Sequence, residues 1–161
     1  MNEFYGKVDL SVILYEVKDK VAYLTFNKPE TYNAIGVSTP GTLKYLVEKA
    51  NLDTSVHLII LRGKGESFCS GYDLKEFANP KKDLFTQKGT YDSLKDYEMM
   101  KYCTDCYMSL FNSLKPVVCC IQGYAIGGGS DIALCCDIII AQEDACLGYP
   151  PVRFVQKILF N

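Results

Sequence analysis

The segment from Lys115 to Asp131, KPVVCCIQGYAIGGGSD, constrains the fold more than any other part of the chain. Its apolar start predicts a buried strand, and its glycine triplet, residues 127–129, predicts a turn whose backbone closely approaches another group. A helix is expected to begin near Ser130. The N–H groups at a helix start lack intrahelical partners, so they can hold a carboxylate, a phosphate or a carbonyl oxygen that gains negative charge.

Strand-like and helix-like segments alternate along the chain. Two β-rich runs separated by Asp19 and Lys20 indicate a hairpin, and strands that alternate with helices indicate parallel pairing. We therefore predict a single α/β domain over residues 1–161, with a mostly parallel sheet flanked by helices. The expected strands are 11–17, 21–27, 56–61, 117–121 and 137–141, and the expected helices are 39–51, 91–114 and 130 to 135 or 136.

Two further expectations concern the middle of the chain. The strand at 56–61 is apolar throughout, which predicts cover on both faces. Residues 80–90 are polar and weakly patterned, which predicts a mobile loop. Apolar residues at spacings of three and four are expected to form the buried face of the helix at 91–114. They are Leu94, Tyr97, Met100, Cys103, Tyr107, Leu110 and Leu114.

Composition excludes several classes of function. The chain is 48% hydrophobic and 22% charged with a formal net charge of −2, and it has no basic block, which argues against nucleic acid as a partner. The uncharged stretch after Lys115 is too short for a membrane span. Residues 1–11 resemble neither a secretory signal nor an Arg-rich transit peptide, which favours the cytoplasm, with the mitochondrion and peroxisome as alternatives.

Eight cysteines lie mostly in apolar runs, so we interpret them as buried thiols in a reducing compartment rather than as disulfides. Cys103 and Cys106 form a lone CxxC motif. Zinc would need two further ligands, which the single histidine, His57, does not supply, so we expect no metal site. The CxxC motif is expected on the apolar face of its helix.

Two loops follow predicted strands, at residues 65–77 and 123–131. In parallel α/β sheets, ligands bind outside the carboxyl ends of the strands. We therefore expect both loops to face one crevice, where one backbone N–H group from each loop converges on a single oxygen. The glycine triplet alone has a simpler explanation, a tight junction between strand and helix.

Four motifs in this order resemble the enoyl-CoA hydratase/isomerase (crotonase) superfamily. They are NKPETYNAI at 27–35, SFCSGYDLKEF at 67–77, KPVVCCIQGYAIGGGSDIALCCDIII at 115–140 and DACLGYPP at 144–151. The resemblance spans about residues 11–153. It implies the ClpP/crotonase spiral of β-β-α units and an acyl-CoA thioester as the bound molecule. Coenzyme A then enters as part of the substrate, and no separate cofactor is expected.

The resemblance also implies a site. The N–H groups of Tyr72 and Gly128 would polarise the thioester carbonyl and stabilise an enolate-like oxyanion. The remaining implied contacts with acyl-CoA are Ala34, Ser70, Asp73, Leu74, Lys75 and Gly127. Lys75 is equally well explained as a surface lysine at a helix start.

The chain departs from the family pattern at both acids of the hydratases. The first glutamate corresponds to Asp131 and the second to Pro151, which has no acid or base. Isomerisation or another one-acid proton transfer therefore suits the chain better than hydration with two carboxylates. Asp131 has an alternative role, since an acid in a first helical turn is stabilised by the helix dipole.

Two functions follow from these observations. One is an enzyme of fatty-acid or acyl-CoA metabolism that works through an enolate. The other is a catalytically impaired homologue that binds CoA or another subunit. The resemblance implies further helices after residue 151 that close the acyl pocket and build a homotrimer or hexamer, so we expect a C-terminally truncated core with exposed apolar surface.

Overall fold

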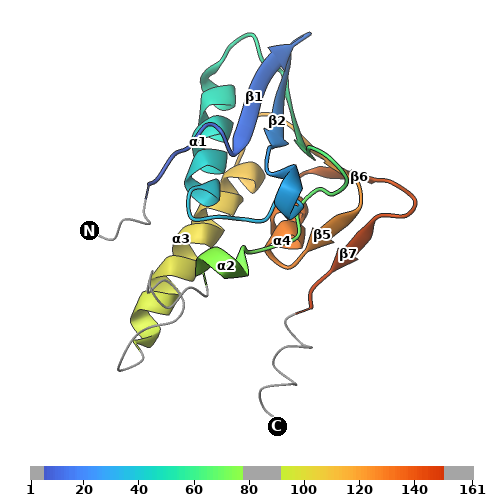
Figure 1. Cartoon of the computed structure of the whole chain (residues 1–161). Coiled ribbons are helices and arrows are strands. Elements are labelled where there is room, and N and C mark those ends of the chain that lie inside the picture. The colour runs from blue at the N-terminus through green and yellow to red at the C-terminus, as the bar shows by residue number, and fades with distance from the viewer. Residues whose placement is uncertain (1–5, 78–91, 151–161) are drawn as a thin grey trace.

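The computed structural model describes residues 6–77 and 92–150, and Figure 1 shows their arrangement. Strands form a five-stranded sheet in the order β1-β2-β3-β4-β6 and a two-stranded sheet of β5 and β7. The predicted loop at 80–90 and Pro151 lie outside the described residues. The α/β architecture with a mostly parallel sheet is confirmed.

The sheet begins with the predicted hairpin. Strand β1 (Ile13–Lys18) pairs antiparallel with β2 (Val21–Phe26). The two residues between them, Asp19 and Lys20, have φ of 49° and 67°. Two successive residues with positive φ are typical of the tight turn that matches the twist of a β-hairpin.

The other strands of the large sheet pair in parallel. Strand β2 pairs with β3 (Leu58–Gly63), β3 with β4 (Val117–Ile121), and β4 with β6 (Ile138–Ala141). The observed β3 begins two residues later than predicted. His57 therefore lies just before the strand, where its N–H donates to the carbonyl of Lys20 at 2.7 Å.

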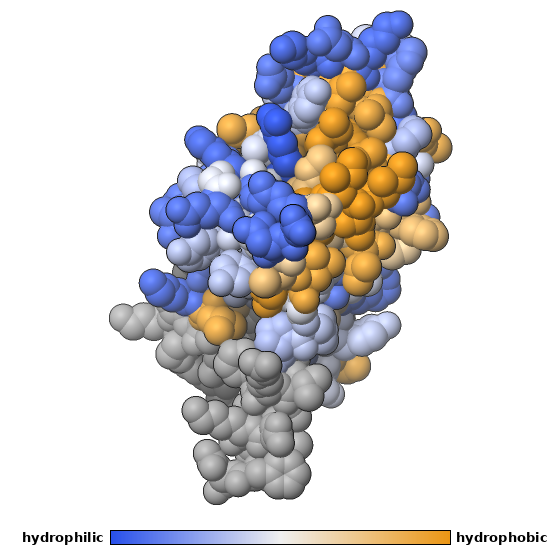
Figure 2. Space-filling view, turned by 90° about the vertical axis from the view of Figure 1, so that its right-hand side faces the viewer, coloured by the Kyte–Doolittle hydropathy of each residue, from blue (hydrophilic) through white to orange (hydrophobic). Residues whose placement is uncertain are grey.

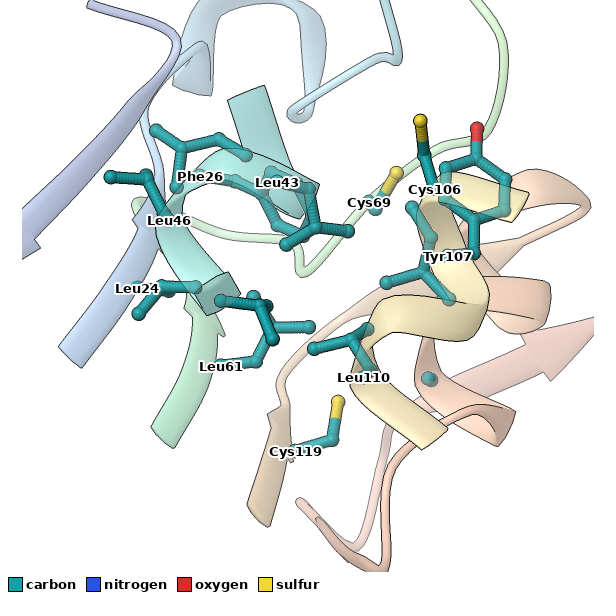
Figure 3. Close-up of a cluster of buried hydrophobic side chains, with 14 of the residues drawn as sticks. Leu24, Phe26, Leu43, Leu46, Leu61, Cys69, Cys106, Tyr107, Leu110 and Cys119 are labelled. Carbon is teal, nitrogen blue, oxygen red and sulfur yellow. The ribbon is translucent and has the colours of Figure 1, made fainter. Parts of the chain in front are cut away.

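Two helices, α1 (Thr39–Leu52) and α3 (Ser93–Phe111), pack against each other beside the sheet (Figure 1). Alternate residues of β2, β3 and β4 are buried, as expected for strands with one face against helices. Figure 3 shows their side chains meeting those of the two helices in one core. Its labelled members are Leu24, Phe26, Leu43, Leu46, Leu61, Cys69, Cys106, Tyr107, Leu110 and Cys119.

The buried face of α3 differs from the prediction. Four residues predicted on that face are exposed: Leu94, Tyr97, Met100 and Leu114. The helix instead buries Met99, Cys103, Cys106, Tyr107 and Leu110. The predicted and observed faces share only Cys103, Tyr107 and Leu110. These residues lie in the C-terminal half of α3, where the helix contacts α1. Leu114 also lies beyond the end of the helix, which stops at Phe111.

A second, smaller sheet was not predicted. Strand β5 (Tyr124–Ile126) pairs in parallel with β7 (Cys146–Gly148). Helix α4 (Gly128–Leu134) follows β5 directly and begins two residues earlier than expected. Each of the segments β1-β2-α1 and β4-β5-α4 is therefore one β-β-α unit.

One side of the large sheet is only partly covered within the described residues. Leu58 and Ile60 of β3 are only half-buried. The prediction that both faces of this strand are covered is therefore wrong for the described residues. Every residue of the edge strand β6 is exposed. Figure 2 shows a hydrophobic band on the side of the molecule where β6 and β7 lie. The exposed apolar side chains of these strands include Ile138, Ile139, Ile140 and Leu147.

Candidate active site

The first and second loops lie side by side because hydrogen bonds join their backbones. Cys69 N–H donates to the carbonyl of Tyr124 at 2.8 Å, and Ile126 N–H donates to the carbonyl of Cys69 at 3.0 Å. These bonds form an isolated parallel bridge between Cys69 and Ala125. The first loop thus extends the small sheet of β5 and β7 by one residue, Cys69, which lies two residues before Gly71.

Glycines allow the backbones to come this close. A Cβ on Gly71 would lie 2.7 Å from the Ile126 carbonyl oxygen and 3.7 Å from the Gly128 nitrogen. Gly71 also has φ of 91°, a conformation that favours glycine. A Cβ on Gly129 would lie 2.5 Å from the Cys69 carbonyl oxygen. Neither contact leaves room for a side chain, so residues 71–72 are held against the start of α4.

A second bridge orients the Tyr72 backbone. Ile35 N–H donates to the Gly71 carbonyl at 2.8 Å, and Asp73 N–H donates to the Ile35 carbonyl at 2.9 Å. In a parallel bridge of this kind, the N–H of the central residue points away from the opposing strand. The Tyr72 N–H is therefore directed away from Ile35.

The side chain of Tyr72 packs between α3 and α4. Its ring makes an edge contact with Phe77, with centroids 5.3 Å apart, and its hydroxyl accepts a hydrogen bond from the Tyr107 hydroxyl at 3.2 Å. A Cβ on Gly128 would lie 2.9 Å from Cε2 of the Tyr72 ring. Burial raises the pKa of the Tyr72 phenol well above its ordinary value, so the group is neutral at physiological pH.

Asp131 lies in the first turn of α4, half-buried. Burial raises the pKa of its carboxyl above the ordinary aspartate value, and its negative charge contributes to the raised pKa of Tyr72. Over residues 6–77 and 92–150, burial alone shifts the pKa of this carboxyl, with no contribution from a hydrogen bond or a neighbouring charge. A desolvated carboxylate without such support is a stronger proton acceptor than a paired one.

Other residues of the implied acyl-CoA contacts hold the loops in place. Ser70 N–H donates to the Tyr32 carbonyl at 2.9 Å, and Ser70 Oγ donates to the Thr31 carbonyl at 3.1 Å. Ala34 N–H also donates to the Thr31 carbonyl, at 3.2 Å. Ser70 and Ala34 therefore both rest against the 3-10 turn η1 (Pro29–Thr31).

Asp73 begins the short helix α2 (Leu74–Phe77). Its Oδ1 accepts hydrogen bonds from the N–H groups of Lys75 at 2.9 Å and Glu76 at 3.3 Å, which is the behaviour of a helix N-cap. The side chains of Leu74 and Lys75 are exposed on this helix.

Gly127 connects β5 to α4. Its N–H donates to the Gly148 carbonyl at 2.9 Å, and its carbonyl accepts from the Asp131 N–H at 3.0 Å and from Ser130 Oγ at 2.7 Å. Gly127 also has φ of 53°. These bonds fix the direction in which α4 leaves the loop, and with it the position of Gly128.

The buried residue Asn33 was not among the predicted site residues. Its Nδ2 donates to the carbonyls of Lys64 at 2.9 Å and Ser67 at 2.8 Å, and its Oδ1 accepts from Lys28 N–H at 2.8 Å. Asn33 therefore fastens the 27–35 motif to the first loop. Its φ of 57° is a conformation that asparagine tolerates better than most residues, so the asparagine itself was the available signal in the sequence.

The prediction of buried thiols holds for four of the eight cysteines, while three are partly buried and Cys146 is exposed. All eight are free, and Cys69, Cys103, Cys106 and Cys119 are buried, so the CxxC motif does lie on the buried face of α3. Burial raises the pKa of the Cys69 thiol to about 12, which makes it a poor nucleophile at neutral pH.

The described residues form neither a metal site nor a membrane span. Among residues 6–77 and 92–150, no group of three or more histidine, cysteine, aspartate or glutamate side chains could hold a metal ion. Within the same ranges, no helix combines the length and the hydropathy needed to cross a bilayer.

The β-β-α units, with two strand-end loops joined at Cys69 and Ala125, define the crotonase fold. Solved structures agree. An enoyl-CoA hydratase from Mycobacterium smegmatis superposes with a TM-score of 0.81 at 43% identity, covering 90% of this chain and 51% of that one. An enoyl-CoA hydratase/isomerase from Xanthobacter autotrophicus Py2 superposes with a TM-score of 0.79 at 32% identity, covering 89% and 51%.

A family model described as enoyl-CoA hydratase/isomerase matches residues 16–154. The chain belongs to this family. It is 32% identical to the (E)-benzylidenesuccinyl-CoA hydratase of Thauera aromatica over 88% of its own length. It is also 32% identical to the short-chain-enoyl-CoA hydratase of Clostridium acetobutylicum over 90%. These alignments cover 51% and 52% of the relatives, so the chain spans about half the length of the curated relatives it matches.

Proposed function

We propose that the chain binds an acyl-CoA thioester, with coenzyme A as part of the substrate and no separate cofactor. The N–H groups of Tyr72 and Gly128 together hold the thioester oxygen. The observation that best supports this proposal is the contact between the two loops. A Cβ on Gly71 would lie 3.7 Å from the Gly128 nitrogen. Donors fixed by a folded backbone need no reorganisation when the oxygen becomes charged.

Asp131 is the proposed proton acceptor and donor. It lies one turn after Gly128, so its carboxylate and the Gly128 N–H belong to the same end of α4. Loss of an α-proton from a thioester produces an enolate whose charge resides on the held oxygen. The burial that raises the pKa of Asp131 also makes its carboxylate a better base near neutral pH.

The proposed reaction class is proton transfer on an enoyl-CoA by one acid, as in isomerisation, within fatty-acid or acyl-CoA metabolism. Hydration by two carboxylates would need a second acid at the position of Pro151. A homotrimer or hexamer, as implied by the family resemblance, is the proposed assembly. The exposed apolar residues of β6 and β7 are consistent with cover from another part of such an assembly.

The second candidate function is binding of CoA or of another subunit without catalysis. Pro151 favours it, because this residue supplies no acid or base. Calorimetry with acetyl-CoA and turnover of a short enoyl-CoA separate the two functions. Binding together with turnover supports the enzyme, and binding alone supports a CoA-binding protein without catalysis. The absence of both rejects the enzyme and CoA binding, and it leaves binding to another subunit.

The oxyanion donors are tested by replacing Tyr72 with its α-hydroxy-acid analogue, which removes the N–H and keeps the ring. Turnover is expected to fall by about 10²- to 10³-fold, since this is the usual effect of losing one such donor. A proline at Gly128 is a poorer test, because any Cβ there would lie 2.8 Å from Cδ1 of Ile35. Unchanged turnover after the backbone replacement at residue 72 would reject the mechanism.

A further inference from the structure

The structure points to a second role for Tyr72. We propose that its ring limits the length of the acyl chain, so that the preferred substrates are short-chain acyl-CoA thioesters. This inference rests on the proposed function, because it assumes that an acyl-CoA carbonyl lies between the Tyr72 and Gly128 amides.

The ring of Tyr72 lies against Gly128. A Cβ on Gly128 would lie 2.9 Å from Cε2 and 3.3 Å from Cδ2 of Tyr72. The ring edge thus fills the space that a side chain at residue 128 would occupy. Since Tyr72 and Gly128 are the two proposed donors, the ring borders the place where the thioester oxygen is held.

Two interactions hold the ring of Tyr72 in place. It makes an edge contact with Phe77, a fully buried residue, with ring centroids 5.3 Å apart. Its hydroxyl accepts a hydrogen bond from Tyr107, which is buried on α3. A swing of the ring away from Gly128 would break both interactions, and aromatic pairs and hydrogen bonds each contribute roughly 1 kcal/mol. The ring is therefore a fixed wall.

The position of Asp131 indicates on which side of the Tyr72 ring the acyl chain lies. Asp131 follows Gly128 by three positions, so both lie on the same face of α4. The charge of Asp131 also acts on the Tyr72 phenol. Acyl carbons whose protons Asp131 moves must lie between this carboxylate and the held oxygen, alongside the ring. A longer chain would next meet Tyr72 and the buried residues behind it, Tyr107 and Cys103.

The experiment compares acyl-CoA thioesters of increasing chain length, from acetyl to octanoyl, by calorimetry on the full chain. For the wild type, affinity is expected to weaken by about tenfold or more between butanoyl-CoA and octanoyl-CoA, since a pocket discriminates by such factors per excess group. Tyr72→Ala keeps the backbone N–H and removes the wall, so the ratio of octanoyl to butanoyl affinity is expected to rise by about tenfold.

Two control variants isolate the ring. Tyr72→Phe keeps the wall and loses only the hydroxyl, so its affinity ratio should stay near that of the wild type. Tyr97→Ala removes an aromatic ring from the exposed surface of α3 and should not change the ratio. If Tyr72→Ala fails to fold, Tyr72→Leu shortens the side chain in the same place and is expected to shift the ratio in the same direction.

The outcomes separate this inference from the function on which it rests. No binding of acetyl-CoA to the wild type would reject the proposed function. Binding of acetyl-CoA with equal wild-type affinity for butanoyl-CoA and octanoyl-CoA would overturn the chain-length inference alone. The chain-length inference would also be overturned if neither Tyr72→Ala nor Tyr72→Leu shifts the ratio of octanoyl to butanoyl affinity.

Discussion

Gly129 lies against Cys69 so closely that a Cβ at Gly129 would be 2.5 Å from the Cys69 carbonyl oxygen and 2.9 Å from the Cys69 Cβ. This contact joins α4 to the first loop. In an exposed helix, replacing glycine with alanine stabilises by about 1 kcal/mol. At Gly129 we expect the opposite, a loss of about 1–3 kcal/mol in the free energy of unfolding, because neither backbone can withdraw.

Urea denaturation of Gly129→Ala measures this effect. Gly148→Ala is the matched control, since a Cβ there would lie 3.4 Å from Cδ1 of Ile126, an ordinary contact. A Gly129→Ala variant as stable as the wild type would mean that the two loops are not pressed together as described.

Asp131→Asn is expected to increase stability at neutral pH. Burial raises the pKa of this carboxyl in the folded chain, so between the unfolded and folded pKa values the folded state binds more protons. Stability is therefore lost as pH rises through that window, and it stays lower above it. The asparagine variant avoids this loss, so its advantage in unfolding free energy should be larger at pH 7 than at pH 3.

Denaturation at the two pH values checks the prediction, with Asp144→Asn on an exposed turn as the control. An Asp131→Asn variant that is less stable than the wild type at pH 7 would instead favour stabilisation of the helix start by the carboxylate.

Turnover of a short enoyl-CoA by Asp131→Asn should be abolished if Asp131 transfers the proton.

Lys115 fastens the C-terminal end of α1. Its Nζ donates to the carbonyl of Ala50, in the last turn of the helix, and to that of Asp53, the C-cap residue. Lys115→Met should reduce the free energy of unfolding by about 1–3 kcal/mol, since hydrogen bonds from a charged donor are lost. Lys44→Met is the control, because the exposed pair of Lys44 with Glu48 at 3.9 Å is worth at most about 0.5 kcal/mol.

The thiols should differ sharply in reactivity. Burial raises the pKa of Cys69 to about 12 and that of Cys103 to about 11, so little reactive thiolate forms at pH 8. Cys146 is exposed. Mass spectrometry after iodoacetamide treatment should find Cys146 alkylated first in the folded chain, with Cys69 and Cys103 protected until urea is added. Rapid labelling of Cys69 under native conditions would contradict the buried position of the first loop.

Local pattern was enough to predict the elements that depend on neighbours in the chain. The hairpin at Asp19 and Lys20, helix α1 and strand β4 each carry their signal within a few residues. Strands β5 and β7 were missed because each has only three residues, too few to show an alternation. Their pairing also joins Tyr124 to Cys146, a distant partner that no local pattern specifies.

Helix α3 shows a second limit. The sequence offers two overlapping stripes of apolar residues, and the spacing of three and four cannot choose between Met100 and Met99. Packing of the folded chain makes that choice, and Met99 is the residue that becomes buried. Periodicity therefore predicted the helix, while tertiary packing determined which face is covered.

In the candidate site, backbone requirements were predictable and side-chain partners were not. The glycine triplet indicated a close approach of backbones, which the contact of Gly129 with Cys69 bears out, whereas the close approach at Gly71 was not predicted. The role of Asn33 depends on the carbonyl of Ser67, which is 34 residues away in the chain. Likewise, the bond from Tyr107 to Tyr72 spans 35 residues and appears only after α3 packs beside the first loop.

The strands of the large sheet lie in the same order as in the chain, apart from β5, which leaves it for the small sheet. A polypeptide that emerges from the ribosome can therefore add each strand to an edge that has already formed. No strand must be inserted between two earlier ones. Growth in one direction places each new strand on the edge opposite β1, and β6 is the last strand to join that edge among the described residues.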